Sequence, residues 1–264
     1  EYAKKITLAL NVRGVINIQL VLSNNRLYVT GISCNLMHNI PFICKATGLR
    51  SIELATRCML GEKLADMGYE GGLNLANNLY AVRVPVFSFD KLRGTDTQLG
   101  SEMKSTGEVL GLAKNFEDAL LKGLIASGVR IKRSGGVLVT VRNSDKQEAI
   151  PVAEKFAQLD FNLYATAGTA KTLNANHVPS SSIRKIHEDS PHILDLINSN
   201  KVVYVISTSE KAENAHGDDG KIRRRALEKQ IPTFTTLETA SALAGCLKKK
   251  RSLEDIELID ITKI

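Results

Sequence analysis

Residues 161–170 have the sequence Phe-Asn-Leu-Tyr-Ala-Thr-Ala-Gly-Thr-Ala, which predicts a β-strand that passes through a tight turn into a helix. The aromatic and aliphatic residues favour a strand, and Gly168 lets the backbone turn. Thr166 and Thr169 place hydroxyl groups where the helix leaves its first amides unpaired. The turn therefore predicts a binding site for an anion such as phosphate. A plain helix N-cap with a second threonine is the alternative, because threonine is a common cap.

Apolar strands alternate with helices on both sides of this turn, from Gly135 to about residue 247. The expected strands are 137–141, 161–165, a weaker 178–183, 202–206 and 233–235, and the expected helices are 145–158, 169–176, 191–199, 220–230 and 237–247. Continuous apolar strands separated by helices indicate an α/β fold with a parallel sheet covered on both faces. Ligands of such sheets bind at the carboxyl ends of the strands.

Polar residues follow four of the expected strands. They are Thr140 and Lys146 after the first, Thr166 and Thr169 after the second, Lys185 after the third, and Ser207, Thr208 and Ser209 after the fourth. Two lysines and several hydroxyls around a helix N-terminus would bind phosphate through charge and hydrogen bonds together. Taken singly, each lysine can be an ordinary surface cation and each serine an ordinary loop residue. Their common edge of the sheet favours one shared site.

The organisation of the chain changes near residue 112. Before it, we expect a helix over 2–12, a β-hairpin with strands at 16–22 and around 28–29, a helix over 52–60, a Gly/Asn-rich loop over 68–78 and a strand over 80–87. A helix over 116–125 and a linker over 130–134 precede the alternating region. The chain opens with Glu1 in a helical pattern that has no cap, and we expect it to be a segment of something longer.

Composition limits the classes of function. The 264 residues are 43% hydrophobic, which suffices for one or two domains. No apolar run reaches membrane-spanning length and no signal peptide is recognisable, so neither a membrane partner nor secretion is expected. The four cysteines show no CxxC spacing and predict reduced thiols in the cytoplasm.

The charge of the chain favours anionic ligands. The net charge is +7, with basic runs at 223–225 and 248–251 that are typical of solvated faces. A nucleic-acid partner is not expected, because the chain has no Trp and only 5% aromatic residues.

Several motifs resemble one family. The stretches at 40–48 (Ile-Pro-Phe-Ile-Cys-Lys-Ala-Thr-Gly) and 100–109 (Gly-Ser-Glu-Met-Lys-Ser-Thr-Gly-Glu-Val) resemble signatures of the second ATP-grasp unit of the carbamoyl-phosphate synthase large subunit. The stretches at 185–193 and 222–224 resemble the regulatory domain that closes the same subunit. The resemblance covers nearly the whole chain except about the last dozen residues.

This resemblance implies a domain organisation. Residues 1–111 would be the C-terminal part of a carbamate-phosphorylating α+β ATP-grasp domain, residues 112–133 a helical linker, and residues 134–264 a Rossmann-like allosteric domain similar to methylglyoxal synthase. The family makes carbamoyl phosphate from glutamine or ammonia, bicarbonate and two ATP, for pyrimidine and arginine synthesis. Its other parts would supply the ATP-binding lobes and a glutaminase subunit.

The resemblance also implies an effector site for a nucleotide such as UMP or IMP. The phosphate and ribose ligands of the family fall on Thr140, Lys146, Thr166, Thr169 and Lys185, with Gly168 in the turn between the threonines. Ser207 and Ser209 stand where relatives carry Asn or Thr, so shorter side chains would face the ribose and base.

Residues 1–111, which resemble the ATP-grasp domain, depart from the metal-binding pattern of the family. Gly31 replaces a glutamate and Ser33 an asparagine that would hold Mg²⁺ or Mn²⁺ against ATP, because hard cations need oxygen ligands. Gln19 matches a residue near these metals and is a weak remnant of the site. His38 replaces an arginine and is more often structural than a metal ligand. We therefore expect no catalytic residue and no bound cofactor in this chain.

Three classes of function remain open: a fragment of the ligase, a nucleotide-binding regulator without activity, and an oligomerisation module. Self-association is expected through apolar hairpin residues such as Leu20 and Leu22. Methylglyoxal synthase activity is a further enzyme hypothesis, but it needs a carboxylate beside the phosphate pocket, and the 166–169 turn contains none. Residues 217–220 (Gly-Asp-Asp-Gly) suggest a loop over the crevice or a plain surface turn.

Overall fold

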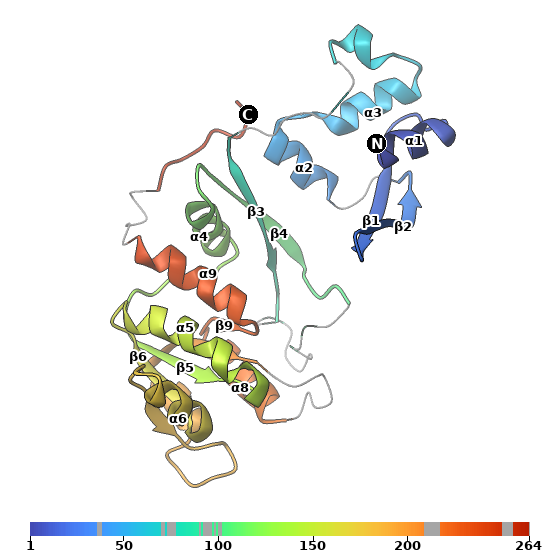
Figure 1. The fold of residues 1–264 in the computed structure, drawn as a ribbon. Helices are drawn as coiled ribbons and strands as arrows, with labels where there is room; N and C mark the ends of the chain where they lie inside the picture. Colours follow the sequence, from blue (N-terminus) through green and yellow to red (C-terminus); the bar gives the residue numbers. More distant parts are fainter. Residues whose placement is uncertain are drawn as a thin grey trace. The chain divides into compact units, whose positions relative to one another are not determined.

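The structure is a computed structural model that describes residues 1–35, 39–69, 72, 78–89, 91, 97, 99, 102–208, 217–249 and 256–263. The chain forms two compact units (Figure 1). One comprises Glu1–Leu79 with Leu258–Ile264, here the N-terminal unit, and the other Tyr80–Glu257, here the C-terminal unit. Among the described residues, none of the helices combines the length and the apolar character needed to span a bilayer.

The C-terminal unit contains a five-stranded parallel sheet with the order β7-β6-β5-β8-β9. Its elements in chain order are β5 (Gly136–Thr140), α5 (Lys146–Ala157), β6 (Asn162–Thr166), α6 (Ala167–Ala175), β7 (Ser181–Ile183), α7 (Ile193–Asn198), β8 (Val202–Ser207), α8 (Asp218–Glu228), β9 (Thr233–Phe234) and α9 (Leu237–Lys248). Each lies within a few residues of its predicted position. The predicted α/β fold with a parallel sheet is confirmed.

Both faces of the sheet are covered, and its central strand β5 is apolar from Val137 to Val139. Val137 and Val139 of β5 face one hydrophobic cluster, which includes Phe156 of α5 and residues of α6 and α9. Leu138, between them, faces a second cluster with residues of α7 and α8. Successive side chains of a strand point to opposite faces, so an unbroken apolar run is what a doubly covered sheet requires.

A second, antiparallel sheet belongs to the C-terminal unit. It pairs β3 (Tyr80–Val86) with β4 (Gly107–Ala113), and α4 (Phe116–Ala126) packs on it. At Gly111 a Cβ atom would lie 1.9 Å from the carbonyl oxygen of Ala119, so only glycine permits this close approach of helix and strand. The sequence predicted β3 and α4 but not β4.

The elements β3, β4 and α4 belong to the same compact unit as the parallel sheet. The predicted domain boundaries at residues 111 and 133 follow the organisation of the family, and they stay a prediction. The segment expected to be a helical linker contains α4.

The N-terminal unit is built from short elements around a β-hairpin. They are α1 (Tyr2–Ala9), β1 (Asn17–Ser23), β2 (Arg26–Ser33), α2 (Ile40–Thr47), α3 (Ser51–Met59) and the 3₁₀ turn η1 (Leu64–Met67). The hairpin and the helices near 2–12 and 52–60 are confirmed, with α1 ending earlier than predicted, whereas α2 was not predicted. The loop expected over 68–78 lies largely outside the described residues.

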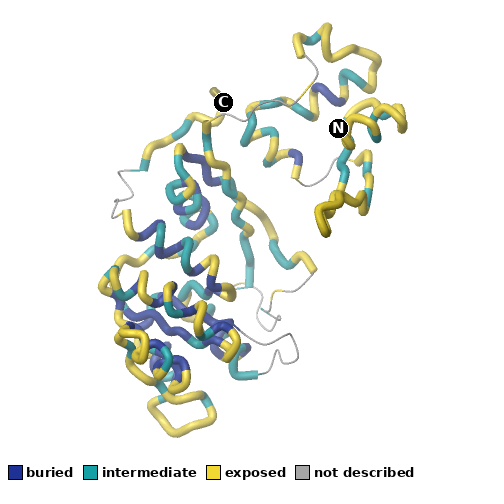
Figure 2. The backbone as a smooth tube through the Cα atoms, viewed as in Figure 1, coloured by how far each residue is buried: buried dark blue, intermediate teal, exposed yellow. Residues whose placement is uncertain are grey.

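The hairpin turn follows from its two asparagines. Asn24 and Asn25 have φ values of 47° and 61°, which is the left-handed conformation that a two-residue hairpin turn requires and that asparagine tolerates. The turn fixes the register so that Ser23 faces Arg26. Little of this hairpin is buried, as Figure 2 shows.

Candidate functional site

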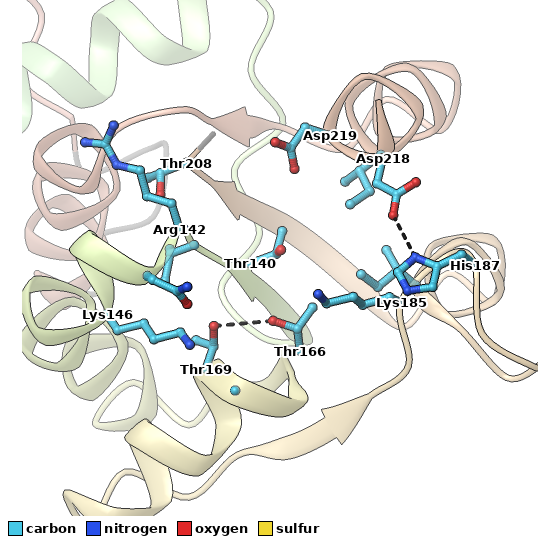
Figure 3. A pocket seen from close by; sticks show the side chains of 15 residues that line it. Thr140, Arg142, Lys146, Thr166, Thr169, Lys185, His187, Thr208, Asp218 and Asp219 are labelled. Atoms are coloured by element: carbon cyan, nitrogen blue, oxygen red, sulfur yellow. Dashed lines mark hydrogen bonds and ion pairs between the residues drawn. The ribbon is translucent and has the colours of Figure 1, made fainter. Parts of the chain in front are cut away.

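The turn at residues 166–169, here the phosphate turn, lies at the edge of a cavity at the carboxyl end of the parallel sheet. The cavity has a volume of about 410 Å³, within the range typical of small-molecule sites. Its lining includes six of the predicted residues, which come from five separate elements or connections: Thr140, Lys146, Thr166, Gly168, Thr169 and Lys185 (Figure 3). The structure therefore brings these six residues together at one edge of the sheet.

The N-cap residue of α6 does not cap the backbone amides of the helix with its side chain. Thr166 occupies the N-cap position but makes no side-chain cap hydrogen bond. Its Oγ1 lies 3.3 Å from Oγ1 of Thr169 instead. Both threonines are buried, and the first amides of the helix stay available to an anion. The plain N-cap alternative is not what the structure shows.

Two lysines approach this turn. Lys146 begins α5, and its Nζ lies where it would be 2.7 Å from a Cβ at position 168. Lys185 follows β7 in the chain, and Figure 3 shows both lysines extending toward the pair of threonines. Glycine at position 168 leaves room for the ammonium group over the turn. A phosphate here would meet two cations, two hydroxyls and backbone amides.

The loop after β5 supports the site through a buried carboxylate. Asp145 accepts hydrogen bonds from Nε of Arg142 at 2.7 Å to both oxygens and from Oγ of Ser144 at 2.9 Å. Burial by itself raises the pKa of Asp145, but hydrogen bonds from Arg142, Thr208 and Ser144 outweigh it and hold the pKa below its usual range. The charge of Arg142 is therefore partly neutralised within the protein.

The opposite wall of the cavity is acidic. Asp218 and Asp219 line it from the first turn of α8, and Nδ1 of His187 lies 3.3 Å from Oδ2 of Asp218. Desolvation raises the pKa of Asp219, against the lowering effect of Arg223. Carboxylates can accept hydrogen bonds from hydroxyl groups of a ligand or act as bases.

The sequence analysis gave these acids no role at the site and placed them near it only as part of a possible loop over the crevice. It suggested a loop or turn over 217–220, whereas α8 already begins at Asp218. The absence of a carboxylate was argued from the 166–169 turn alone, and the carboxylates come from another element. The one signal was position, since residues that follow β8 must approach the same sheet edge as the phosphate turn.

The remaining predicted site residues lie elsewhere. Ser207 ends β8 with its side chain fully buried and outside the cavity lining, and Thr208 lines the cavity instead. Ser209 and His38 lie outside the described residues. Gln19 belongs to the N-terminal unit.

The hairpin brings Gln19 opposite Gly31. The two residues pair across β1 and β2, and Oε1 of Gln19 lies 3.0 Å from where a Cβ of residue 31 would stand. One amide oxygen is a poor ligand set for a divalent cation, which takes about six oxygens. In the described part of the chain, no group of three or more His, Cys, Asp or Glu residues could hold a metal.

Comparisons with known proteins identify relatives of the chain. A family model described as the MGS-like domain matches residues 148–235. The chain is 39% identical over 264 residues to the carbamoyl phosphate synthase large chain of Lachnoclostridium phytofermentans. This match covers all of the chain and 25% of that protein. It is 38% identical over 263 residues to the carbamoyl phosphate synthase large chain of Clostridium botulinum strain Loch Maree, covering 99% of this chain and 25% of that protein.

Proposed function

We propose that this chain, a homologue of the C-terminal quarter of the carbamoyl phosphate synthase large chain, binds the phosphate of a nucleotide monophosphate effector in its C-terminal unit. One observation supports this most strongly. Lys146, Lys185 and the pair of Thr166 and Thr169 come from three separate segments of the chain, yet they line one cavity at an uncapped helix N-terminus.

The other walls of the cavity suit the rest of a nucleotide. Ile193 and Ile222 line it and offer an apolar surface to a base. Asp218 and Asp219 offer carboxylate oxygens to ribose hydroxyls. UMP and IMP combine a phosphate, hydroxyls and a planar base, so both are candidate effectors.

The catalytic role belongs to a larger assembly in this proposal. The chain spans about a quarter of the length of the curated relatives that it matches. We infer that it acts with the rest of a synthase large chain and a glutaminase subunit, which would make carbamoyl phosphate for pyrimidine or arginine synthesis. Residues 1–111 would be the end of the ATP-grasp domain, while ATP and Mg²⁺ or Mn²⁺ would be held by parts other than this chain. We expect this partnership in the cytoplasm.

The exposed hairpin is the proposed surface for assembly. Leu20, Leu22 and Tyr28 are exposed on β1 and β2 of the N-terminal unit. Exposed apolar side chains that gather on one element mark interaction sites. In the isolated chain, a second copy would take the place of the missing partner. Light scattering should show association that grows with concentration, and Leu22→Lys should weaken it; a monomer at every concentration contradicts this part of the proposal.

The test of the effector site is isothermal titration calorimetry with UMP and IMP. Either or both should bind, uridine and inosine should not, and inorganic phosphate should compete, because the phosphate supplies the charge-assisted contacts. Lack of nucleotide binding at millimolar concentration would leave the oligomerisation role as the better explanation. Synthase assays with and without the remaining ATP-grasp parts would then separate a ligase fragment from a regulator without activity.

A second candidate function has one observation in its favour. Asp218, paired with His187, lines the same cavity as the phosphate turn, and this is the carboxylate that methylglyoxal synthase activity needs. A base in this place could remove a proton from dihydroxyacetone phosphate, after which the phosphate would leave. Formation of methylglyoxal by the purified chain, abolished by Asp218→Asn, would support this activity. Its absence at saturating substrate would rule it out.

A further inference from the structure

The loop between β7 and α7 brings residues to two walls of the phosphate cavity. In this loop, here the lysine loop (residues 184–192), Lys185 extends toward the phosphate turn and His187 contacts Asp218 of α8 (Figure 3). Ile193, the first residue of α7, lines the cavity directly after the loop. The conformation of the loop therefore decides whether Lys185 can meet an anion.

Burial contributes little to holding the lysine loop in place. Its residues are exposed apart from Ile186 and His192, which are partly buried. Ile186 packs against the hydrophobic cluster that α7 and α8 share. Because an exposed loop gains little from hydrophobic burial, the position of Lys185 depends on polar contacts.

Arg184 ties the start of the lysine loop to its end. Its Nη1 donates hydrogen bonds to the carbonyl oxygens of Asp189 at 3.3 Å and Ser190 at 3.2 Å. Its own carbonyl oxygen accepts a hydrogen bond from the amide of Ile193 at 3.1 Å. The side chain of Arg184 is not part of the described cavity lining. It therefore holds the loop without facing a ligand, directly beside the lysine that does.

Asp195 fixes the end of the lysine loop to α7. Its Oδ2 accepts hydrogen bonds from the amide of His192 at 3.0 Å and from Oγ of Ser190 at 2.8 Å. These two bonds hold the pKa of Asp195 below its usual range, so the carboxylate is charged at neutral pH. As the third residue of α7, Asp195 also stands where an acid stabilises the start of a helix.

We propose that Arg184 and Asp195 are positioning residues of the phosphate cavity, which hold the lysine loop in the conformation that presents Lys185 to a bound phosphate. This inference rests on the proposed function, because it concerns the same cavity. A loop that is already fixed in its binding conformation loses less conformational entropy when the ligand binds. The two residues therefore raise affinity without touching the ligand.

The test measures the calorimetric affinity of UMP and IMP for Arg184→Met and Asp195→Asn. Each variant should weaken the nucleotide that binds wild type by about three- to tenfold, because each loses hydrogen bonds that fix the loop. Arg184→Lys keeps the charge and can still donate to a carbonyl oxygen, so it should recover part of the loss.

Two matched controls make the same chemical changes away from the cavity. Arg133 is also exposed and donates to a backbone carbonyl oxygen, that of Leu247, at 3.4 Å. Asp118 is also the third residue of its helix, α4, and accepts a hydrogen bond from Nδ2 of Asn115 at 2.7 Å. Arg133→Met and Asp118→Asn should leave nucleotide affinity unchanged.

A double-mutant cycle separates positioning from a general loss of structure. If Arg184 acts through Lys185, Arg184→Met should weaken binding in wild type but add little to Lys185→Ala. A merely structural defect would weaken binding equally in both backgrounds. Amide hydrogen exchange gives a second readout, in which Arg184→Met should lower the protection of the Glu188 and Ile193 amides but not that of Val139 in β5.

Three results would overturn the inference. Nucleotide affinity that is unchanged in Arg184→Met or in Asp195→Asn would contradict it and leave the proposed function standing. An equal loss from Arg184→Met in the wild-type and Lys185→Ala backgrounds would show that Arg184 does not act through the lysine. Lack of nucleotide binding to wild type would contradict the proposed function and this inference with it.

Discussion

The two units use apolar residues in opposite ways. In the C-terminal unit, Val137, Leu138 and Phe156 are fully buried, and the sheet and its helices close their own core. In the N-terminal unit, Leu22 is 69% exposed and Tyr28 50% exposed, and the hairpin buries neither of its faces (Figure 2). A strand with apolar side chains gains stability only when something packs on it. The difference teaches that the C-terminal unit packs its apolar strands within itself, whereas the hairpin exposes apolar side chains on which a partner could pack.

The largest expected effect is a contrast in stability between the two units. Phe156→Ala should lower the free energy of unfolding by about 3–5 kcal/mol, because it empties a fully buried site in contact with Phe161 and Tyr204. Leu22→Ala should change it by about 0.5 kcal/mol or less, because the side chain is already in water. Urea denaturation followed by circular dichroism measures both. Similar losses for the two variants would mean that the hairpin is packed in solution.

A smaller contrast concerns one ion pair in each unit. Asp145→Asn should cost about 1–2 kcal/mol at pH 7, because it removes charge-assisted hydrogen bonds to a buried carboxylate. Since the pKa of Asp145 is lowered in the fold, its contribution is complete above the ordinary value of 3.8 and is lost as the pH falls through the lower folded value.

The matched variant in the N-terminal unit is Glu62→Gln, which removes the ion pair of Glu62 with Arg57. It should have a smaller effect at every pH, because both groups are exposed and water screens them. Urea titrations of both variants from pH 7 down to pH 2 give the comparison. A difference between Asp145→Asn and wild type that does not shrink in acid would show that the carboxylate charge is not the cause.

The next effect concerns a single hydroxyl in the phosphate turn. Thr169→Val keeps the shape of the side chain but removes the hydroxyl that lies beside Thr166. UMP affinity should fall by about two- to tenfold, the value of one hydrogen bond of about 0.5–1.5 kcal/mol. Thr172→Val is the control on the same helix, because Thr172 is not a lining residue of the cavity and its hydroxyl donates to the Gly168 carbonyl. Equal effects of the two variants on calorimetric affinity would exclude a direct role for the hydroxyl of Thr169.

The last expectation is that the purified chain has no catalytic activity with ATP. The hairpin offers Gln19 opposite Gly31 and no carboxylate on either residue, so the purified chain should show no magnesium-dependent ATP turnover. A coupled assay for ADP release measures it, with the complete synthase of a relative as the positive control. Turnover above background would mean that the N-terminal unit keeps a metal site that its sequence does not suggest.

Much of the C-terminal unit could be predicted from the sequence, because its strands are short apolar runs and its helices start and stop near clear signals. The strand ends then gave Lys146, Thr166, Thr169 and Lys185, since parallel strands bring their carboxyl ends to one edge. Prediction worked here because local patterns and the global fold agree.

Prediction failed where the deciding contacts are distant in the sequence. The strand β4 (Gly107–Ala113) contains glycines that disfavour a strand, and it exists because β3 pairs with it and α4 packs on it. The helix α2 (Ile40–Thr47) begins with Ile40-Pro41, a pattern compatible with a loop as well as a first helical turn. The acidic wall of the phosphate cavity comes from α8, which is distant in the sequence from the phosphate turn, and no local pattern predicts that the two meet.

The most direct measurement is the calorimetric affinity of UMP and IMP for wild type, Lys185→Ala and Lys171→Ala. Lys185 lines the phosphate cavity, and Lys171 is an exposed lysine of α6 outside it. Lys185→Ala should weaken the nucleotide that binds by about ten- to a hundredfold, because it removes a charge-assisted contact of about 1.5–3 kcal/mol, while Lys171→Ala should match wild type. No binding to wild type at millimolar concentration, or equal binding to all three proteins, would contradict the assignment of this cavity as a phosphate site.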